Sequence, residues 1–127
     1  MIFPEVIIHQ PDSFEDFRGE LYTLYKENDY NLNFNHDKVS ISRKNTLRGL
    51  HGDNKSWKLV TCLAGEIYLV IVDNSHFILS KEATFFYKWS YPGKYPDVDD
   101  QFTLKWNDPK LNITWPNFNP ILSSRDK

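Results

Sequence analysis

The stretch KLVTCLAGEIYLVIVD, residues 58–73, decides the fold class of this chain. Two arms rich in β-branched and other apolar residues flank the sequence Ala-Gly-Glu at residues 64–66. Such residues favour strands, and a glycine between two strand-like runs suits a tight turn. The pattern predicts two strands joined as a β-hairpin.

Segments on either side of this stretch alternate with the period of a strand. They are GELYTLYK (residues 19–26), KVSISRK (38–44) and HFILSKEATFFYKWSY (76–91), the last with two strands and a turn near residues 80–82. We find no convincing helix longer than a turn or two. Several short strands separated by turn signals predict an all-β sandwich or small barrel.

The pattern changes after Tyr91, where five of the seven prolines fall and apolar runs become rare. We expect this part to be an ordered wrap over the strands, held down by Trp106, Trp115 and Phe118. The sequence contains no repeats. At 127 residues, the chain is expected to form a single domain over residues 1–127.

Composition narrows the class of partner. Lys and Arg number 15 against 17 Asp and Glu, a net charge of −2, so no nucleic-acid partner is expected. Cys62 is the only cysteine, which excludes an internal disulfide and suits a reducing cytoplasm. No apolar run is long enough to cross a membrane, and the start MIFPEVIIHQ lacks the basic region of a signal peptide.

The four histidines, His9, His36, His51 and His76, do not occur at the spacings H-x-H or H-x-x-x-H. A catalytic metal usually needs several such ligands in close reach, so no metal is expected. Phosphate-binding glycine loops and the G-x-S-x-G motif are missing from the sequence as well.

Four single residues remain as candidates for chemistry: His51 after LRGL, Lys58 at a strand start, Tyr87 in FFYKWSY and Asp126 in ILSSRD. Each has an ordinary explanation when taken alone, as a loop histidine, a solvated lysine, a core aromatic or a chain-end carboxylate. Only a pattern that includes all four can favour a shared function.

Seven blocks supply that pattern, because in this order they resemble the sugar-nucleotide 3,5-epimerases typified by dTDP-4-dehydrorhamnose 3,5-epimerase. The resemblance implies an all-β cupin-type jelly roll, or double-stranded β-helix, that forms a homodimer and uses no metal or cofactor. It also implies a nucleotide-diphospho-sugar substrate with a 4-keto-6-deoxy sugar. The blocks are DFRGELY (16–22), VSISRKNTLRGLH (39–51), KLV (58–60), GEIYLVIVD (65–73), HFILSKEATFFYK (76–88), WNDPKLNITWP (106–116) and ILSSRD (121–126).

The resemblance implies catalytic roles for the four single residues. His51 matches the base that removes the proton next to the ketone, and Asp126 matches its carboxylate partner. Tyr87 matches the acid on the opposite face, and Lys58 the cation near the enolate oxygen. These residue types suit the reaction, since a neutral histidine accepts a proton, a phenol is protonated near pH 7 and an ammonium stabilises an oxyanion.

It also implies substrate contacts. Arg48 matches a diphosphate anchor, as does Arg18, which in the family reaches across from the other subunit; arginine binds phosphate with a planar fork. Glu20 and His76 match further substrate contacts. Tyr91 is a weaker match to a second active-site tyrosine, because its spacing differs.

One departure concerns the sugar. Family members typically have an aromatic residue after RGLH, whereas this chain has Gly52 and Asp53. The segments RGLHGDNKSWKLVTC (48–62) and YPGKYPDVDDQFTLKWND (91–108) resemble the branch that epimerises GDP-linked 4-keto-6-deoxy-heptoses in capsule or O-antigen synthesis. Losing an aromatic side chain is expected to make room for a bulkier sugar inverted at C3, C5 or both.

A second departure concerns length. Asp73 is followed almost directly by the block that starts at His76, where family members have a long stretch with several strands. Roughly thirty residues are missing between Asp73 and Ser75, equivalent to several strands of five or six residues. Either the sequence omits a segment of the protein or the chain is truly shortened. The retained catalytic blocks favour omission.

Two alternatives to an active epimerase remain. One is an inactive or truncated cupin that binds sugar nucleotides without reaction. The other is a 3,4-ketoisomerase of the same fold, which uses a histidine pair that we cannot identify in this sequence.

Overall fold

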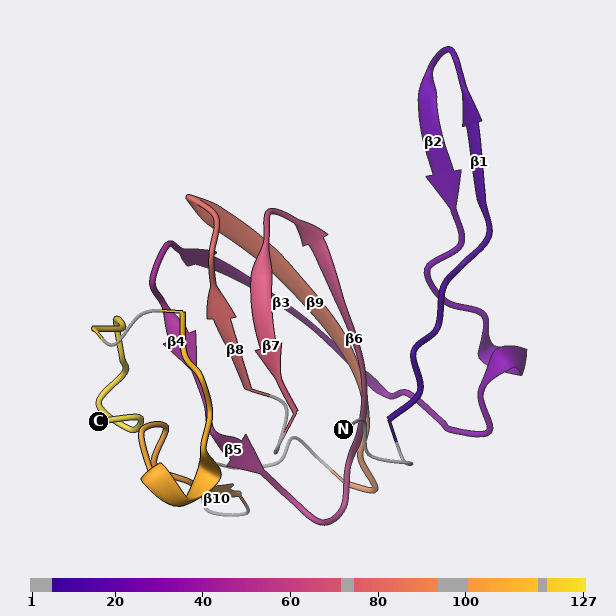
Figure 1. Ribbon diagram of the computed structural model, residues 1–127. Helices are drawn as coiled ribbons and strands as arrows, with labels where there is room; N and C mark the ends of the chain where they lie inside the picture. The colour runs from indigo at the N-terminus through magenta and orange to yellow at the C-terminus, as the bar shows by residue number, and fades with distance from the viewer. Residues whose placement is uncertain (1–5, 72–74, 94–100, 117–118) are drawn as a thin grey trace. The chain divides into compact units, whose positions relative to one another are not determined.

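The computed structural model describes residues 6–71, 75–93, 101–116 and 119–127, and the side chains of 75–78 are not discussed (Figure 1). The predicted all-β class is confirmed, since its regular elements are β-strands and single 3₁₀ turns within these residues. Contacts divide the chain into two compact units, Met1–Asn33 and Phe34–Lys127, each described by itself below. The single domain therefore stays a prediction.

The first unit is built around a β-hairpin. Strands β1 (Ser13–Asp16) and β2 (Gly19–Tyr22) pair antiparallel, and all their side chains are exposed. Gly19 has a φ of 127°, a conformation that glycine adopts without strain. The strand predicted for residues 19–26 ends at Tyr22, and a short 3₁₀ turn, η1 (Glu27–Asp29), follows.

The main sheet of the second unit has β9 (Glu82–Ser90) at its centre, between β3 (His36–Arg43) and β6 (Trp57–Ala64). Both pairings are antiparallel. β9 buries Ala83, Phe85 and Trp89 on one face, as the alternation of its sequence predicts.

A second three-stranded sheet has the order β4 (Leu47–Arg48), β8 (Ser75–Ile78) and β7 (Ile67–Val70). Two further short strands, β5 (His51–Gly52) and β10 (Phe102–Thr103), pair with each other.

The hairpin predicted for residues 58–73 is wrong, although both of its strands exist. β6 pairs with β9 and β7 pairs with β8, so the chain passes from one sheet to the other at Gly65. Gly65 has a φ of 82°, and a Cβ there would lie 2.2 Å from the carbonyl oxygen of Glu82. The start of β9 therefore packs tightly against the turn, and the two arms separate instead of pairing.

The predicted wrap after Tyr91 covers a small core. Leu47, Leu50 and Trp115 are buried together, and Trp106 packs against them. The indole nitrogen of Trp115 donates to the carbonyl of Trp106 at 2.8 Å. The wrap includes the 3₁₀ turn η3 (Pro109–Leu111). Phe118, the third predicted anchor, lies outside the described residues.

The strands on either side of the short connection, β7 and β8, pair with each other. β7 and β8 form an antiparallel pair in which Val70 is opposite Ser75, so neighbouring strands meet where family members are longer. The spacing of consecutive Cα atoms from Asp73 to Ser75 would test for an omitted segment, but it depends on residues 73 and 74, which lie outside the described residues. An intact mass of 15.1 kDa would show a genuine short connection. A mass larger by roughly thirty residues, several strands, would show omission.

Candidate active site

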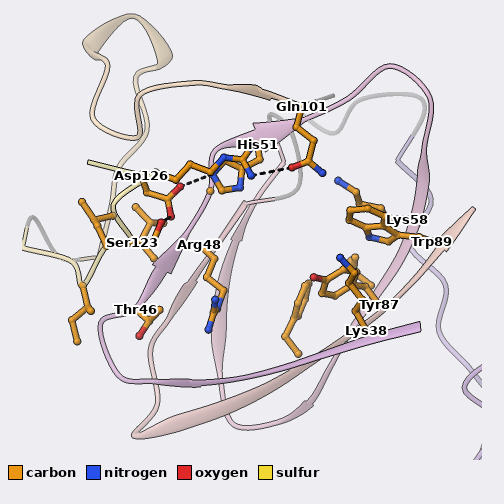
Figure 2. Close-up of a pocket in the computed structure, with 17 residues that line it drawn as sticks. Lys38, Thr46, Arg48, His51, Lys58, Tyr87, Trp89, Gln101, Ser123 and Asp126 are labelled. Atoms are coloured by element: carbon orange, nitrogen blue, oxygen red, sulfur yellow. Dashed lines mark hydrogen bonds and ion pairs between the residues drawn. The ribbon is translucent and has the colours of Figure 1, made fainter. Parts of the chain in front are cut away.

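A cavity of about 440 Å³ lies in the second unit, between its two three-stranded sheets and the C-terminal segment (Figure 2). This volume is within the range of small-molecule sites. All four residues predicted to be catalytic line it: His51, Lys58, Tyr87 and Asp126. They come from β5, β6, β9 and the last turn of the chain, so folding gathers residues that are far apart in sequence.

His51 and Asp126 form a direct pair at one end of this cavity. The Nε2 atom of His51 is bonded to Oδ1 of Asp126, whose side chain is buried. The other carboxylate oxygen accepts from Oγ of Ser123 at 2.8 Å, so both oxygens are satisfied. A carboxylate at Nε2 holds the ring hydrogen there and leaves Nδ1 with the lone pair of a base.

Tyr87 and Lys58 lie at the other end, beside Trp89 (Figure 2). The Tyr87 ring is 5.8 Å from the Trp89 ring, and Nζ of Lys58 is 4.8 Å from the Trp89 ring centroid. Burial raises the pKa of the Tyr87 phenol, while the charge of Arg48 lowers it by less. The phenol is therefore protonated at neutral pH and able to donate.

Lys38 is a cavity residue that the sequence reasoning missed. It projects from β3, and its Nζ is 4.4 Å from the Trp89 ring centroid. Two ammonium groups thus contact one indole ring. Burial, followed by the charge of Lys58, lowers the pKa of Lys38. The alternation of β3 could have indicated Lys38. The even-numbered residues from His36 to Ser42 face inward, and Lys38 is one of them.

Arg48 and His76 are brought together on neighbouring strands. Arg48 lines the cavity, and its Nε donates to Oγ of buried Ser42 at 2.9 Å. In the β4–β8 pairing Arg48 lies opposite His76. The backbone thus places His76 beside a cavity residue.

Tyr91 belongs to the second unit but is not among the described residues that line its cavity. It is buried, with its backbone bonded to the Asn35 side chain at 2.6 and 3.2 Å. Arg18 and Glu20 belong to the hairpin of the first unit. The Arg18 side chain bonds Asp16 there at 2.5–3.1 Å.

Arg125 and Gln101 were also missed. Arg125 precedes Asp126 and donates from Nε to Oγ1 of Thr103 at 3.3 Å and from Nη1 to Oε1 of Gln101 at 3.2 Å. Both Arg125 and Gln101 line the cavity. Arg125 stood within the block ILSSRD, but its partners are more than twenty residues away, and no local pattern indicates them.

Within the described ranges, no three His, Cys, Asp or Glu side chains gather as a metal site would require. Nor does that part of the chain contain a helix long and apolar enough to cross a membrane.

Comparison with known proteins decides the family. Residues 1–76, more than half of the chain, match the family model described as dTDP-4-dehydrorhamnose 3,5-epimerase. The chain belongs to this family. It is therefore an isomerase of the epimerase type, as the ordered blocks predicted. The match ends next to the short connection between β7 and β8.

Curated epimerases resemble either nearly the full length of the chain or about half of it. The dTDP-4-dehydrorhamnose 3,5-epimerase of Shigella flexneri is 29% identical over 163 positions, covering 97% of this chain and 88% of the relative. That of Escherichia coli K12 is 37% identical over 78 residues, covering 54% and 42%. The first alignment is longer than the chain, so this relative carries residues that have no counterpart here.

Solved epimerase structures confirm the cupin jelly-roll class. A Bacillus anthracis enzyme with TDP and PPi bound has a TM-score of 0.81 at 25% identity, covering 92% of this chain and 88% of that one. A Legionella pneumophila enzyme in complex with dTDP-4-keto-L-rhamnose has a TM-score of 0.79 at 26% identity, covering 91% and 81%. The epimerase fold is thus retained despite the short connection.

Proposed function

We propose that this chain epimerises C3, C5 or both in a nucleotide-linked 4-keto-6-deoxy sugar. One observation carries the proposal: the His51–Asp126 pair and the protonated Tyr87 phenol line the same cavity from different strands and loops. Epimerisation needs a base and an acid on opposite faces of one carbon, and this arrangement supplies both.

The proposed reaction has two proton transfers. Nδ1 of His51 takes the proton from the carbon next to the ketone, and the electron pair moves to the ketone oxygen as an enolate. Lys58 stabilises that oxyanion, and Asp126 stabilises the imidazolium. Tyr87 then donates its proton to the opposite face as the ketone re-forms. Exchange with solvent returns the proton to Tyr87 and removes it from His51.

The substrate is proposed from two kinds of support. The Legionella and Bacillus structures hold dTDP-4-keto-L-rhamnose, TDP and PPi, and Arg48 offers a guanidinium to such phosphates here. The Gly52–Asp53 sequence favours the finer proposal of a GDP-linked heptose used in capsule or O-antigen synthesis. Gly52 itself is buried and is not among the described residues that line the cavity, so this finer proposal depends on sequence blocks alone.

The test is incubation with a panel of dTDP- and GDP-linked 4-keto-6-deoxy sugars in deuterated buffer. We expect deuterium at C3 or C5 with at least one substrate, and loss of this exchange in His51→Ala. His9→Ala, which changes an exposed histidine of the first unit, is the matched control. Full exchange in His51→Ala would remove His51 as the base. Binding without exchange would favour the inactive binder, and a product ketone at C3 the ketoisomerase.

The proposal includes a homodimer formed in the cytoplasm, where the lone Cys62 suits a reducing environment. The outer face of the main sheet supports a dimer. Val39 and Ile41 of β3 are 60% and 63% exposed, and Trp57 of β6 is 53% exposed. In register, Val39 lies opposite Phe86 of β9 on this face. Exposed apolar sheet surfaces of this kind often mark interfaces between subunits.

Arg18 is proposed to complete the partner's diphosphate site. Mixing two inactive variants tests this directly. If Arg18 acts in the other subunit, co-refolded His51→Ala and Arg18→Ala chains regain activity, because one site of the mixed dimer has both residues. If Arg18 acts in its own subunit, no mixed site is complete and activity stays absent. Chromatography with light scattering measures the dimer in the same samples.

A further inference from the structure

Arg125 connects two separate segments next to the proposed base. From the last turn of the chain, its guanidinium donates to Thr103 of β10 at 3.3 Å and to Gln101 at 3.2 Å. Figure 2 shows Gln101 between His51 and Lys58, and all three residues line the cavity. The two bonds use different nitrogens of one planar group, which a lysine cannot reproduce.

One of the two segments that Arg125 joins carries Asp126, and the other contains β10, which pairs with the strand β5 that carries His51. In the β5–β10 pairing Thr103 lies opposite His51, and the next amide, that of Leu104, donates to the carbonyl of Leu50 at 2.9 Å. Asp126 follows Arg125 directly. His51 is thus linked to Asp126 in two ways. One is their direct hydrogen bond, and the other runs through the strand partner Thr103 and its hydrogen bond with Arg125.

Both segments need such a connection. β5 and β10 contribute two residues each, and a ladder that short is only marginally stable by itself. Asp126 lies outside the strands, where no sheet pairing holds it in place. Backbone bonds anchor this segment at Ile121, through Asn45 and Leu47, five residues before Asp126.

Arg125 also carries a cost. Its Nη2 atom is buried and finds no acceptor within the described residues. A buried donor without a partner is destabilising, and such groups in folded proteins often mark a functional constraint. The buried guanidinium is explained if its hydrogen bonds to Thr103 and Gln101 are both needed.

We propose that Arg125 is a positioning residue that sets the geometry of the His51–Asp126 pair by tying the Asp126 turn to Gln101 and Thr103. This inference rests on the proposed function for its consequence in catalysis. Its structural part, an effect on the His51–Asp126 hydrogen bond, stands independently of any substrate.

The experiment compares Arg125→Lys with Arg43→Lys, an exposed position on β3 that serves as the control. A misplacement of about 1 Å at a catalytic pair costs on the order of 100-fold in rate. We expect Arg125→Lys to lower kcat by about 10- to 100-fold with little change in KM. The downfield proton signal of the His51 ring, measured by NMR without substrate, should be lost or shifted in the same variant.

A double variant tests the route of the effect. If Arg125 acts through Asp126, then Arg125→Lys should have little further effect on kcat in an Asp126→Asn background, because coupled residues are not additive. Thr103→Val and Gln101→Leu remove the same contacts from the other side and keep the test valid if Arg125→Lys does not fold. Each is expected to shift the His51 signal and lower kcat less than Arg125→Lys does.

Three outcomes would overturn the inference. An unchanged His51 signal and kcat in Arg125→Lys would show that the connection is unnecessary. A rise in KM with kcat intact would make Arg125 a ligand contact instead. Full additivity with Asp126→Asn would show an independent role. If no sugar nucleotide reacts with the wild-type chain, the proposed function fails, but the NMR comparison still decides whether Arg125 positions the pair.

Discussion

The two ends of the cavity are built in different ways. At the base end, named for the proposed base His51, the paired residues His51 and Asp126 are 75 positions apart. Ser123 donates a hydrogen bond to Asp126, and we propose that the bond from Arg125 to Thr103 helps to align the pair. At the acid end, named for the proposed acid, Tyr87 stands on the inward face of a long central strand. Function at the base end should therefore be sensitive to geometry, whereas function at the acid end should depend on charge and protonation.

Asp126→Asn should have the largest effect of the single changes that keep the side-chain shape. The amide removes the negative charge that steadies the imidazolium and permits the wrong histidine tautomer. In the serine-protease triad, the equivalent change lowers kcat by about 10⁴-fold. We expect a loss of about 10³- to 10⁴-fold in kcat, measured by deuterium exchange, with KM nearly constant. Asp12→Asn, at an exposed position, should have no effect. A wild-type kcat in Asp126→Asn would show that the base end does not depend on the geometry of the His51–Asp126 pair.

Tyr87→Phe should separate the two proton transfers. Without its hydroxyl the inversion is expected to slow by about 10²- to 10⁴-fold, whereas exchange of the substrate proton through His51 continues. Because burial raises the pKa of the Tyr87 phenol above its ordinary value, the wild-type enzyme should not lose its acid as the pH rises from 7 to 9.

Proton NMR of the substrate in deuterated buffer measures exchange and inversion together. Tyr68→Phe, on β7 and 37% exposed, is the matched control. Equal loss of exchange and inversion in Tyr87→Phe would contradict its role as an acid on the second face.

Lys38→Met should show whether charge governs the acid end. Methionine keeps the packing against Trp89 but removes an ammonium that attracts an anionic substrate. We expect KM to rise by up to about tenfold, and the difference from wild type to shrink at high salt, as screening of charges requires. Lys44→Met, an exposed position after β3, should leave KM unchanged. A KM effect that is the same at all salt concentrations would indicate packing rather than charge.

The sequence predicted the positions of the strands better than it predicted which strands pair with each other. Alternation identified β3, β8 and β9, because the period of side chains is a local property. The pairing of β6 was mistaken for a hairpin, because the close approach of Glu82 to Gly65 is a tertiary contact. A glycine turn looks the same in sequence whether the flanking strands pair or separate.

The same distinction applies to the site. His51, Lys58, Tyr87 and Asp126 were found through ordered blocks, and the structure brings them to one cavity. The proposed role of Arg125 could not be found in this way, because it depends on two partners more than twenty residues away. Side chains that only position others leave little trace in a single sequence.

A substitution of Asp53 should have the smallest effect of those predicted, and the effect should be on stability. Asp53 lies in the segment that connects the two ends of the cavity. It follows β5, which carries His51, and precedes β6, which carries Lys58. Its carboxylate accepts from the amides of Lys55 and Ser56 at 2.8 and 2.7 Å and from the Ser56 hydroxyl at 2.6 Å. Burial opposes ionisation, but these bonds and the charge of Lys58 outweigh it and lower the pKa of Asp53 below 3.8.

A lowered pKa means that the charged form of Asp53 stabilises the fold. This contribution is present above the unfolded pKa, near 3.8, and is lost as the pH falls through the lower folded value. Asp53→Asn should therefore lower the free energy of unfolding by about 1 kcal/mol at pH 7, and the difference should shrink in more acidic solution. Urea unfolding at pH 7 and at pH 3 measures both values. A difference that stays constant would show that the turn depends on side-chain shape alone, and that no charge is needed to connect the two ends of the cavity.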